Sequence, residues 1–482
     1  MNAAAPLRFF REITQIPRDS GDERRVTDYL LAFARQRGLT AHRDSVLNVV
    51  IRKPGTSGME QRPVLTLQSH VDMVYIKAQG CPHEYASPLA LVEEEGWLRA
   101  DGTSLGADNG TGMAFALALL DSADLPHPPL EALFTTDEEV GMHGARALSA
   151  DMVTGRRMLN MDSEEDDVFT AGCAGGLHVN IAFQAGLRDT AAGSEGVLLQ
   201  VQGLRGGHSG IEIDKGRGNA IRLMGRLLYT VQSVLPVQVC AVSGGSKMNA
   251  IPDRAQAMVA VSPADLPAFG ALVDRCHADY FAELSTADPD LSLALLPATA
   301  PARALAPDSL DRLLLLLLNL PIGPQSMSRH LPGLVESSNN MGMLRSGVDG
   351  AITISCAVRS MVGSLRTAIA DQIDTLARAA GATTEQEAAY PPWTFQPDSP
   401  FRARCAELYR ELFGESPKVG AIHAGLECGF FKELIPDLEI VSFGAVIKGA
   451  HTPREMLDLR SMERVWRLLC HLARHLDDVP QT

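Results

Sequence analysis

The eight cysteines of this 482-residue chain form no Cys-x-x-Cys pair and no tight cluster. They occur at positions 81, 173, 240, 276, 356, 405, 428 and 470. Structural zinc and iron–sulfur sites use closely spaced cysteines, and small secreted domains use a dense disulfide framework. The spacing fits none of these classes, so we expect reduced, mostly buried thiols in a cytoplasmic protein.

A long hydrophobic run is also missing. The most unusual apolar run, Leu313–Leu318, consists of leucine alone and is flanked by Asp311 and Arg312. A membrane-spanning helix needs about 20 apolar residues, so a buried helix is the better interpretation. The segment that begins at Met1 lacks the apolar core of a secretory signal as well. We therefore expect no association with a membrane.

An excess of positive charge is also missing, because 58 acidic residues outnumber 43 basic ones and the formal net charge is −15. Proteins that bind nucleic acids neutralise phosphates with a basic surface, so we expect no nucleic-acid partner. A hydrophobic content of 45% and a charged content of 21% are typical of soluble globular proteins. A length of 482 residues predicts two domains rather than one.

Apolar runs alternate with helix-like segments in the first part of the chain. The predicted strands are 46–51, 64–67, 130–136 and 158–161, and the predicted helices lie within 7–37, 110–120 and 144–150. Strands that alternate with helices are typical of an α/β domain with a mostly parallel central sheet. We assign this domain to residues 1–180.

The pattern changes after Gly176 to pairs of strands with helices between them. The predicted strands are 197–202, 238–242, 255–261 and 351–358, and the predicted helices are 220–229, 266–284, 309–318 and 364–380. This is α+β patterning, which predicts an inserted domain at 181–390. Alternation then returns over 391–482, so we expect this segment to complete the first domain.

The stretch Leu65–Val74 ends an apolar run with the sequence His70-Val-Asp72. Side chains two positions apart on a strand point to the same face. An imidazole binds a metal best when a carboxylate holds its other ring nitrogen, which His70 and Asp72 could provide. The same tripeptide is also common in strands that bind nothing.

Acidic residues follow other predicted elements in the same way. Asp108 stands in a glycine-rich turn just before a helix, where it is either a ligand or an N-cap. Glu138 and Glu139 end a strand, and because neighbouring side chains diverge, one can bind a metal while the other faces a water. An acidic turn is the alternative. Asp162 follows the strand 158–161 and is a ligand or an ordinary loop acid.

His451 lies in a loop of small residues after the predicted strand 438–442. Ligands in α/β sheets gather beyond the carboxyl ends of strands, which is where these candidates fall. Two nitrogens and three carboxylates suit two zinc ions with one bridging carboxylate and positions left open for water. The candidate ligands are His70, Asp108, Glu139, Asp162 and His451.

These motifs, taken in order along nearly the whole chain, resemble those of the M20 metallopeptidases, and within them the bacterial aminoacyl-histidine dipeptidases. The matching stretches are His70-Val-Asp72, Gly106–Gly110, Asp137–Gly141, Asp162-Ser-Glu164 and His451. The resemblance implies a zinc-peptidase catalytic domain interrupted by an inserted lid and dimerisation domain. It also implies two Zn²⁺ per subunit, with Co²⁺ or Mn²⁺ as substitutes.

The resemblance gives each residue of the first set a role. By it, His70 and Asp162 hold one zinc, Glu139 and His451 hold the other, and Asp108 bridges them. Asp72 would orient His70, and Glu138 would be the general base. A cis peptide bond between Asp108 and Asn109 is implied as well.

The inserted domain carries a second set of candidates. His208 lies in Gly206–Gly210, Asn249 follows Met248, and Arg359 ends a strand. Composition alone favours ordinary turn and surface roles for them. The resemblance implies that His208 stabilises the oxyanion and that Asn249 and Arg359 grip the carboxylate of the substrate, often from the partner subunit. His423 and Gly425, in a further matching stretch, would line the pocket.

We therefore expect a metal-dependent dipeptidase that acts on small peptides, Xaa-His dipeptides of the β-Ala-His type foremost, and that forms a homodimer through the inserted domain. One alternative is an N-acyl-amino-acid deacylase of the same superfamily. Another is a non-catalytic metal-binding homologue. A two-metal phosphoesterase fits less well, because the chain has an acidic balance and no glycine-rich phosphate cradle.

Overall fold

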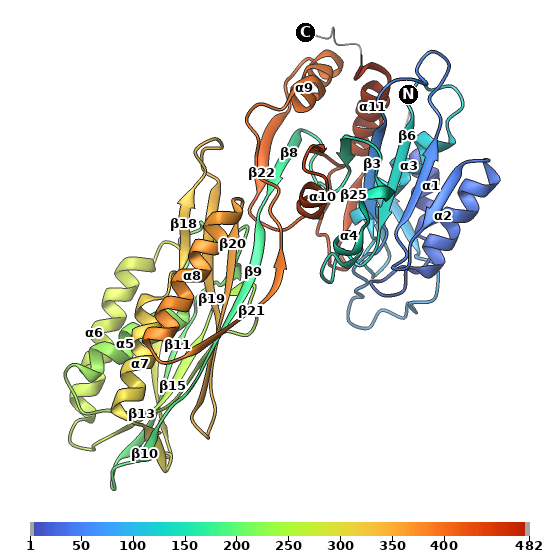
Figure 1. Ribbon diagram of the computed structural model, residues 1–482. Coiled ribbons are helices and arrows are strands. Elements are labelled where there is room, and N and C mark those ends of the chain that lie inside the picture. The colour runs from blue at the N-terminus through green and yellow to red at the C-terminus, as the bar shows by residue number, and fades with distance from the viewer. Residues whose placement is uncertain (1–3, 478–482) are drawn as a thin grey trace. The chain divides into compact units, whose positions relative to one another are not determined.

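The computed structural model describes residues 4–477 and divides into two units (Figure 1). Unit 1 holds the chain up to Cys173, Phe395–Ala421 and the chain from Leu426 onward. Unit 2 holds Ala174–Thr394 and Ile422–Gly425. The unit borders thus fall at 173/174 and 394/395, where the sequence predicts 180/181 and 390/391. Residues 422–425, which include His423, return to unit 2.

Unit 1 is built on an eight-stranded sheet of mixed direction. In sheet order the strands are β1 (Thr40–Arg43), β2 (Val49–Lys53), β6 (Leu130–Thr135), β3 (Leu65–His70), β7 (Arg157–Asn160), β23 (Glu439–Ser442), β8 (Val168–Cys173) and β22 (Lys418–Ile422). The four central strands, β6, β3, β7 and β23, are parallel, and antiparallel pairs flank them. Strands β3 and β6 are buried along their whole length, which explains their continuous apolar character.

Seven α-helices and a small second sheet complete unit 1 over the described residues. The helices are α1 (Ala4–Ile13), α2 (Arg24–Gln36), α3 (Ala107–Asp121), α4 (His143–Ala147), α9 (Pro400–Phe413), α10 (Cys428–Leu434) and α11 (Leu459–His475). The second sheet has the order β24 (Ile447–Lys448), β25 (Met456–Asp458), β5 (Trp97–Ala100) and β4 (Leu91–Glu94).

Helix α3 is buried on almost every side and packs against α1, α11 and β3. Its small residues allow this close approach. A Cβ atom on Gly112 would lie 2.7 Å from the carbonyl oxygen of Met161 and 2.9 Å from Cβ of Ser69. The start of α3 therefore lies directly against the ends of β3 and β7.

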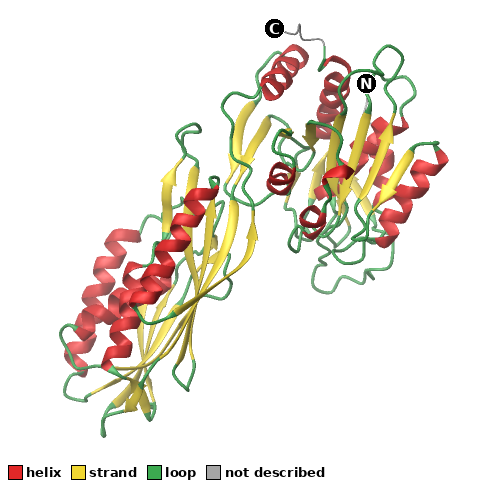
Figure 2. Ribbon diagram, viewed as in Figure 1, coloured by secondary structure: helices red, strands yellow, loops and turns green. Residues whose placement is uncertain are grey.

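Unit 2 contains a nine-stranded sheet whose neighbours are all antiparallel. Its strands are β9 (Gly175–Gln184), β11 (Glu195–Gln202), β13 (Gln238–Gly244), β15 (Ala255–Val261), β16 (Ser292–Ala298), β18 (Gly323–Met327), β19 (Val335–Ser346), β20 (Ala351–Ser360) and β21 (Thr383–Tyr390). Helices α5 (Ala220–Gln232), α6 (Leu266–Leu284), α7 (Pro307–Asn319) and α8 (Gly363–Ala379) cover one face of this sheet (Figure 2). Two further strand pairs are β10 (Leu187–Asp189) with β17 (Arg303–Leu305), and β12 (Gly207–His208) with β14 (Ala250–Ile251).

The leucine run lies in α7, as a buried helix. Four of its leucines, Leu313, Leu314, Leu316 and Leu317, are buried, and Leu315 is 37% exposed. No helix within residues 4–477 is long and apolar enough to cross a membrane. All eight cysteines are free thiols, six of them buried.

Candidate metal centre

Three predicted ligands gather at one edge of the unit 1 sheet. His70 is the last residue of β3, while Glu139 follows β6 and Asp162 follows β7. Strands β6, β3 and β7 are parallel neighbours, so their carboxyl ends meet at the same edge. The sequence pattern of acids and histidine after apolar runs therefore predicts their proximity correctly.

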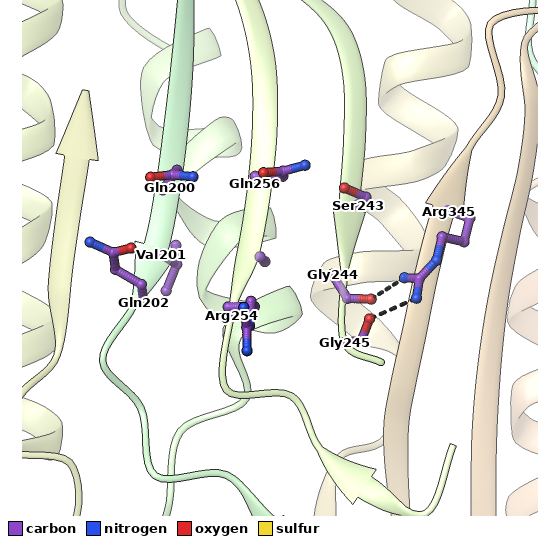
Figure 3. Close-up of a pocket in the computed structure, with 10 residues that line it drawn as sticks. Gln200, Val201, Gln202, Ser243, Gly244, Gly245, Arg254, Gln256 and Arg345 are labelled. Carbon is purple, nitrogen blue, oxygen red and sulfur yellow. Dashed lines mark hydrogen bonds between the residues drawn. The ribbon is translucent and has the colours of Figure 1, made fainter. Parts of the chain in front are cut away.

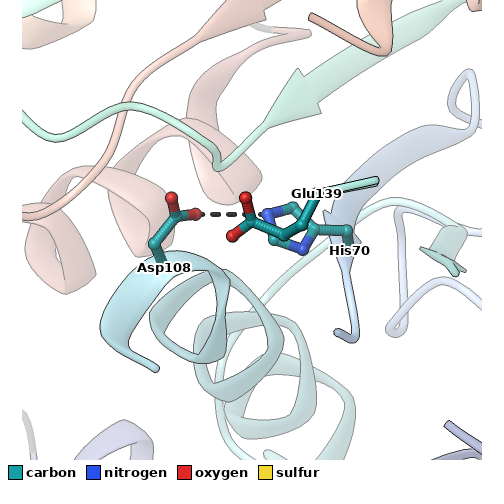
Figure 4. Close-up of side chains that lie close together, drawn as sticks. All are labelled: His70, Asp108 and Glu139. Carbon is teal, nitrogen blue, oxygen red and sulfur yellow. Dashed lines mark hydrogen bonds and ion pairs between the residues drawn. The ribbon is translucent and has the colours of Figure 1, made fainter. Parts of the chain in front are cut away.

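Asp108 and His451 reach this edge from other elements. Asp108 is the second residue of α3, and His451 lies in the loop between β24 and β25. Oδ1 of Asp108 is 3.2 Å from Nε2 of His70, and Oδ2 is 3.3 Å from Nε2 of His451. The two oxygens of one carboxylate thus face two separate imidazoles, and Figure 4 shows Asp108 with His70 and Glu139.

A second carboxylate stands beside each imidazole. Oδ1 of Asp162 is 3.3 Å from Nε2 of His70, and Oε1 of Glu139 is 2.8 Å from Nε2 of His451. Ligand atoms of His70, Asp108 and Glu139 all lie within 4.8 Å of one another. The five side chains therefore form two groups of three that share Asp108. The peptide bond between Asp108 and Asn109 is cis.

The carboxylates of this cluster stabilise positive charge at its centre. Hydrogen bonds to Asp108 and Glu139 raise the pKa of His451 to about 11. Burial opposes ionisation of Asp108, but hydrogen bonds from the two imidazoles outweigh it and lower the pKa of that carboxyl. Burial raises the pKa of Asp162 to about 6. Imidazole nitrogens and carboxylate oxygens in this arrangement match the donor set of divalent zinc, so the residues fit such an ion.

Asp72 lies behind the cluster and is fully buried. Its Oδ1 is 3.3 Å from Nδ1 of His70. The same carboxylate accepts the backbone N–H groups of Glu138 and Glu139, each at 3.1 Å. It therefore holds the strand end of β3 against the turn that follows β6.

The side chain of Glu138 lies close to the cluster and its pKa is raised well above the ordinary value. Burial is the main cause. The charge of His70 lowers the pKa of Glu138, whereas the charge of Asp162 raises it. A carboxyl group with a raised pKa at such a site is suited to accept and return a proton.

The second predicted set lies in unit 2, where His208 has a defined tautomer. Its Nδ1 accepts the backbone N–H groups of Gly210 at 3.2 Å and Ile211 at 3.1 Å. A neutral ring must then carry its proton on Nε2. Burial and the charge of Arg359 lower the pKa of His208, which keeps the ring neutral near pH 7. His208 therefore offers a hydrogen-bond donor at Nε2.

Arg359 and His423 lie near His208. The guanidinium of Arg359 is buried and donates from Nη1 to the hydroxyl of Tyr390 at 2.9 Å. Its Nε has no hydrogen-bond partner among the residues that the structure describes. Nε2 of His423 is 2.7 Å from the hydroxyl of Ser338. Burial and the charge of Arg359 lower the pKa of His423 to about 3.

Asn249 lies on the loop beside His208, and its side chain is exposed. The backbone N–H of Ser209 donates to the carbonyl oxygen of Asn249 at 2.9 Å. The side chain of Asn340 holds the flanking carbonyls of Met248 and Ala250. Gly425, two residues beyond His423, belongs to the same unit. All members of the second set thus belong to unit 2, whereas the five candidate ligands belong to unit 1.

Several buried polar residues at these sites have no recognisable pattern in the sequence. Glu455 and Arg18 bond to the backbone around Asp108. Glu427 accepts hydrogen bonds from Gln68 and Thr135, and burial raises its pKa to about 8. An acidic residue four positions after a predicted ligand is the only local signal for Glu455.

Unit 2 also has a cavity of about 400 Å³ between β11, β13, β15 and β19 (Figure 3). One of its two arginines, Arg345, donates to the carbonyl oxygens of Gly244 at 2.6 Å and Gly245 at 2.7 Å. Those bonds tie β19 to the end of β13, where the two strands share a single register pair. None of the predicted site residues lines this cavity, and Arg345 has a structural role in it.

Comparison with known proteins connects these features with peptide hydrolysis. A model described as "Peptidase family M20/M25/M40" matches residues 66–475. The chain is 37% identical over 468 residues to the cytosol non-specific dipeptidase of Escherichia coli (strain K12). The matched region covers 97% of this chain and 96% of that protein. The crystal structure of aminoacylhistidine dipeptidase from Vibrio alginolyticus matches with a TM-score of 0.92 and 35% identity, over 100% of this chain and 98% of that one.

A more distant match is the aminopeptidase PepT of Bacillus cereus, with 15% identity and a TM-score of 0.56 over 99% of each chain. At that identity the likeness concerns the fold alone. Together these matches confirm the α/β fold class that the sequence predicts.

Proposed function

The chain belongs to peptidase family M20/M25/M40, and we propose that it hydrolyses dipeptides at a two-metal site, Xaa-His dipeptides foremost. The family and the dipeptidase class predicted from the sequence are confirmed, because the relatives from Escherichia coli and Vibrio alginolyticus, 37% and 35% identical over 97% and 100% of this chain, are both dipeptidases. The observation that carries the two-metal proposal is the position of Asp108, whose two oxygens face two imidazoles.

By this proposal the first ion is held by His70, Asp108 and Asp162, and the second by His451, Asp108 and Glu139. Zinc is the ion that we propose, with Co²⁺ or Mn²⁺ as substitutes, because the donors are imidazole nitrogens and carboxylate oxygens. When bound, such ions supply Lewis acidity toward the peptide carbonyl and lower the pKa of water.

Glu138 is the proposed general base. It takes a proton from the attacking water and returns it to the nitrogen of the leaving amine. Its raised pKa supports both steps, because a group that ionises nearer neutrality can accept and donate a proton at the working pH. Asp72 supports it indirectly, through the backbone bond to Glu138 and the contact with His70.

Unit 2 supplies the proposed substrate contacts. His208 donates from Nε2 to the oxyanion that forms when water adds to the carbonyl. Arg359 and Asn249 bind the free carboxylate of the dipeptide, and His423 and Gly425 line the pocket. A buried guanidinium with a free Nε suits a carboxylate, which favours short substrates with a C-terminus within reach.

The proposal includes a cytoplasmic location and a homodimer formed through unit 2. The first is supported by a relative named as a cytosol dipeptidase and by the free cysteines. The net charge of −15 supports the proposal that the protein does not bind nucleic acids. The dimer remains a proposal from the family resemblance, and the oligomeric state in solution tests it.

A substrate panel tests the proposed reaction. We expect zinc-loaded protein to hydrolyse β-Ala-His, Gly-His and Ala-Ala, with the Xaa-His substrates turned over best. N-acetyl-alanine is the matched control, because it has the same C-terminal carboxylate but no free amino group. Turnover of N-acetyl-alanine alone would favour the deacylase. The dipeptidase relatives argue against that outcome.

A further inference from the structure

One buried carboxylate caps the turn that presents Asp108. Glu455 is 2% exposed, and its Oε2 accepts the backbone N–H groups of Leu105 at 2.7 Å and Gly106 at 2.9 Å. Its Oε1 accepts the N–H of Ala107 at 2.7 Å, with the N–H of Asp108 at 3.4 Å. Four successive amides therefore point toward one carboxylate.

The cap comes from a distant part of the chain. The first amides of a helix lack partners within the helix, and a side chain next to the helix start usually provides them. Here Gly106 precedes α3 with φ +67°, and it has no side chain to do so. Glu455 stands 349 residues further along the chain and only four residues after His451. The bonds of Glu455 thus join the His451 loop to the Asp108 turn.

Arg18 donates a hydrogen bond to the same turn. It is 1% exposed, and its guanidinium donates to the carbonyl oxygen of Gly106. It also donates to the carbonyl oxygens of Val71 at 2.8 Å and Asp72 at 2.7 Å. Arg18 therefore joins the end of β3, where His70 lies, to the turn whose amides bind Glu455.

The two halves of the candidate metal centre differ in how their ligands are held. His70 and Asp162 come from the ends of β3 and β7, which are paired within a large sheet. His451 is 47% exposed, adopts φ +59° and lies between two strands of two and three residues. A ligand on a loop between such short strands gains from an anchor close by, and the bonds of Glu455 to the Asp108 turn provide one.

We propose that Glu455 is a positioning residue that fixes His451 relative to Asp108 and thereby sets up the metal position formed by His451, Asp108 and Glu139. The inference rests on the two-metal site of the proposed function. It follows that loss of Glu455 weakens that position more than the one formed by His70, Asp108 and Asp162. Substitution of a residue that supports a metal ligand typically lowers metal affinity about 10–100-fold.

The test is a Co²⁺ titration of the metal-free full-length protein, with wild type compared to Glu455→Gln. Glutamine keeps the shape but leaves one NH₂ group facing backbone N–H donors. We expect one of the two ions to bind within about threefold of wild type and the other to lose about 10–100-fold in affinity. The visible spectrum of bound Co²⁺ reports the second ion independently of turnover. Glu463→Gln, at an exposed position on α11, is the matched control.

The outcomes separate this inference from the proposed function. Wild-type protein that binds one Co²⁺ or none would defeat the two-metal site itself. If wild type binds two ions and Glu455→Gln weakens both equally, or neither, Glu455 is merely a structural cap and the inference is wrong. Should Glu455→Gln fail to fold by circular dichroism, Glu455→Asp takes its place, since it keeps the charge but shortens the reach. The same selective loss is then expected.

Discussion

The carboxylate of Asp72 accepts the backbone N–H of Glu138 at 3.1 Å while lying 3.3 Å from Nδ1 of His70. One buried group thus holds both a candidate metal ligand and the proposed general base. Because Asp72 fixes the ring and the turn together, its loss disturbs metal binding and proton transfer at once.

Asp72→Asn is expected to lower zinc affinity and kcat about 10–100-fold with little change in KM. The asparagine keeps one oxygen for the backbone amides but loses the negative charge beside His70. Zinc content by atomic absorption and kinetics on β-Ala-His measure the effect. Asp124→Asn, at an exposed position, serves as the control. Unchanged zinc affinity in Asp72→Asn would contradict the assigned role.

His208→Ala is expected to lower kcat about 100–1000-fold and to leave KM within a few-fold, because its Nε2 donor acts on the oxyanion and not on the bound substrate. The tautomer set by Gly210 and Ile211 is the basis of this expectation. Steady-state kinetics with zinc-saturated protein measure it. A rise in KM alone would assign His208 to substrate binding instead.

Arg359→Met is expected to raise KM for Ala-His roughly 30-fold, since loss of one partner of a buried charge pair costs about 2 kcal/mol or more. The C-terminal amide Ala-His-NH₂ lacks the carboxylate and provides the matched substrate control. We expect wild type to discriminate strongly against the amide and the variant to treat both substrates alike. Equal discrimination by both proteins would place the carboxylate elsewhere.

His423 predicts a pH dependence of stability in unit 2. Its pKa falls from 6.5 to about 3 in the folded chain. Between these values the unfolded chain binds a proton that the folded chain does not, so this group lowers stability as pH falls below 6.5. The slope is at most about 1.4 kcal/mol per pH unit.

His423→Gln removes this proton uptake and is therefore expected to lose less stability than wild type between pH 7 and pH 5. Hydrogen exchange of β19, which carries the contact of Ser338 with His423, measures the free energy of opening. His330→Gln, at an exposed position, is the control and should follow wild type. Parallel pH profiles for all three proteins would show that His423 has no such effect.

The central strands and the positions of three candidate ligands could be predicted because their signals are local. Apolar runs such as β3 and β6 end in acids or histidine, and parallel strands bring those ends together. Helix α6 likewise matches its predicted span, residues 266–284. Short-range patterns were sufficient at these places.

Other features depend on distant partners and leave no local pattern. Strand β19 contains buried Asn339 and Asn340, whose amides bond to backbone carbonyls far along the chain, so it does not look like a strand. Strand β21 forms an edge and is mostly exposed, so it lacks apolar alternation. The position of Glu455 beneath Asp108 is set by the tertiary fold alone.

The most direct test of the two-metal hydrolase with Glu138 as general base compares wild type with Glu138→Gln after both proteins are loaded with zinc by the same procedure. Zinc stoichiometry and hydrolysis of β-Ala-His are measured together. We predict two zinc ions per chain in both proteins and a loss of kcat of at least about 100-fold in the variant, because glutamine cannot accept the proton from water. A variant that keeps both ions and near wild-type turnover would contradict the account.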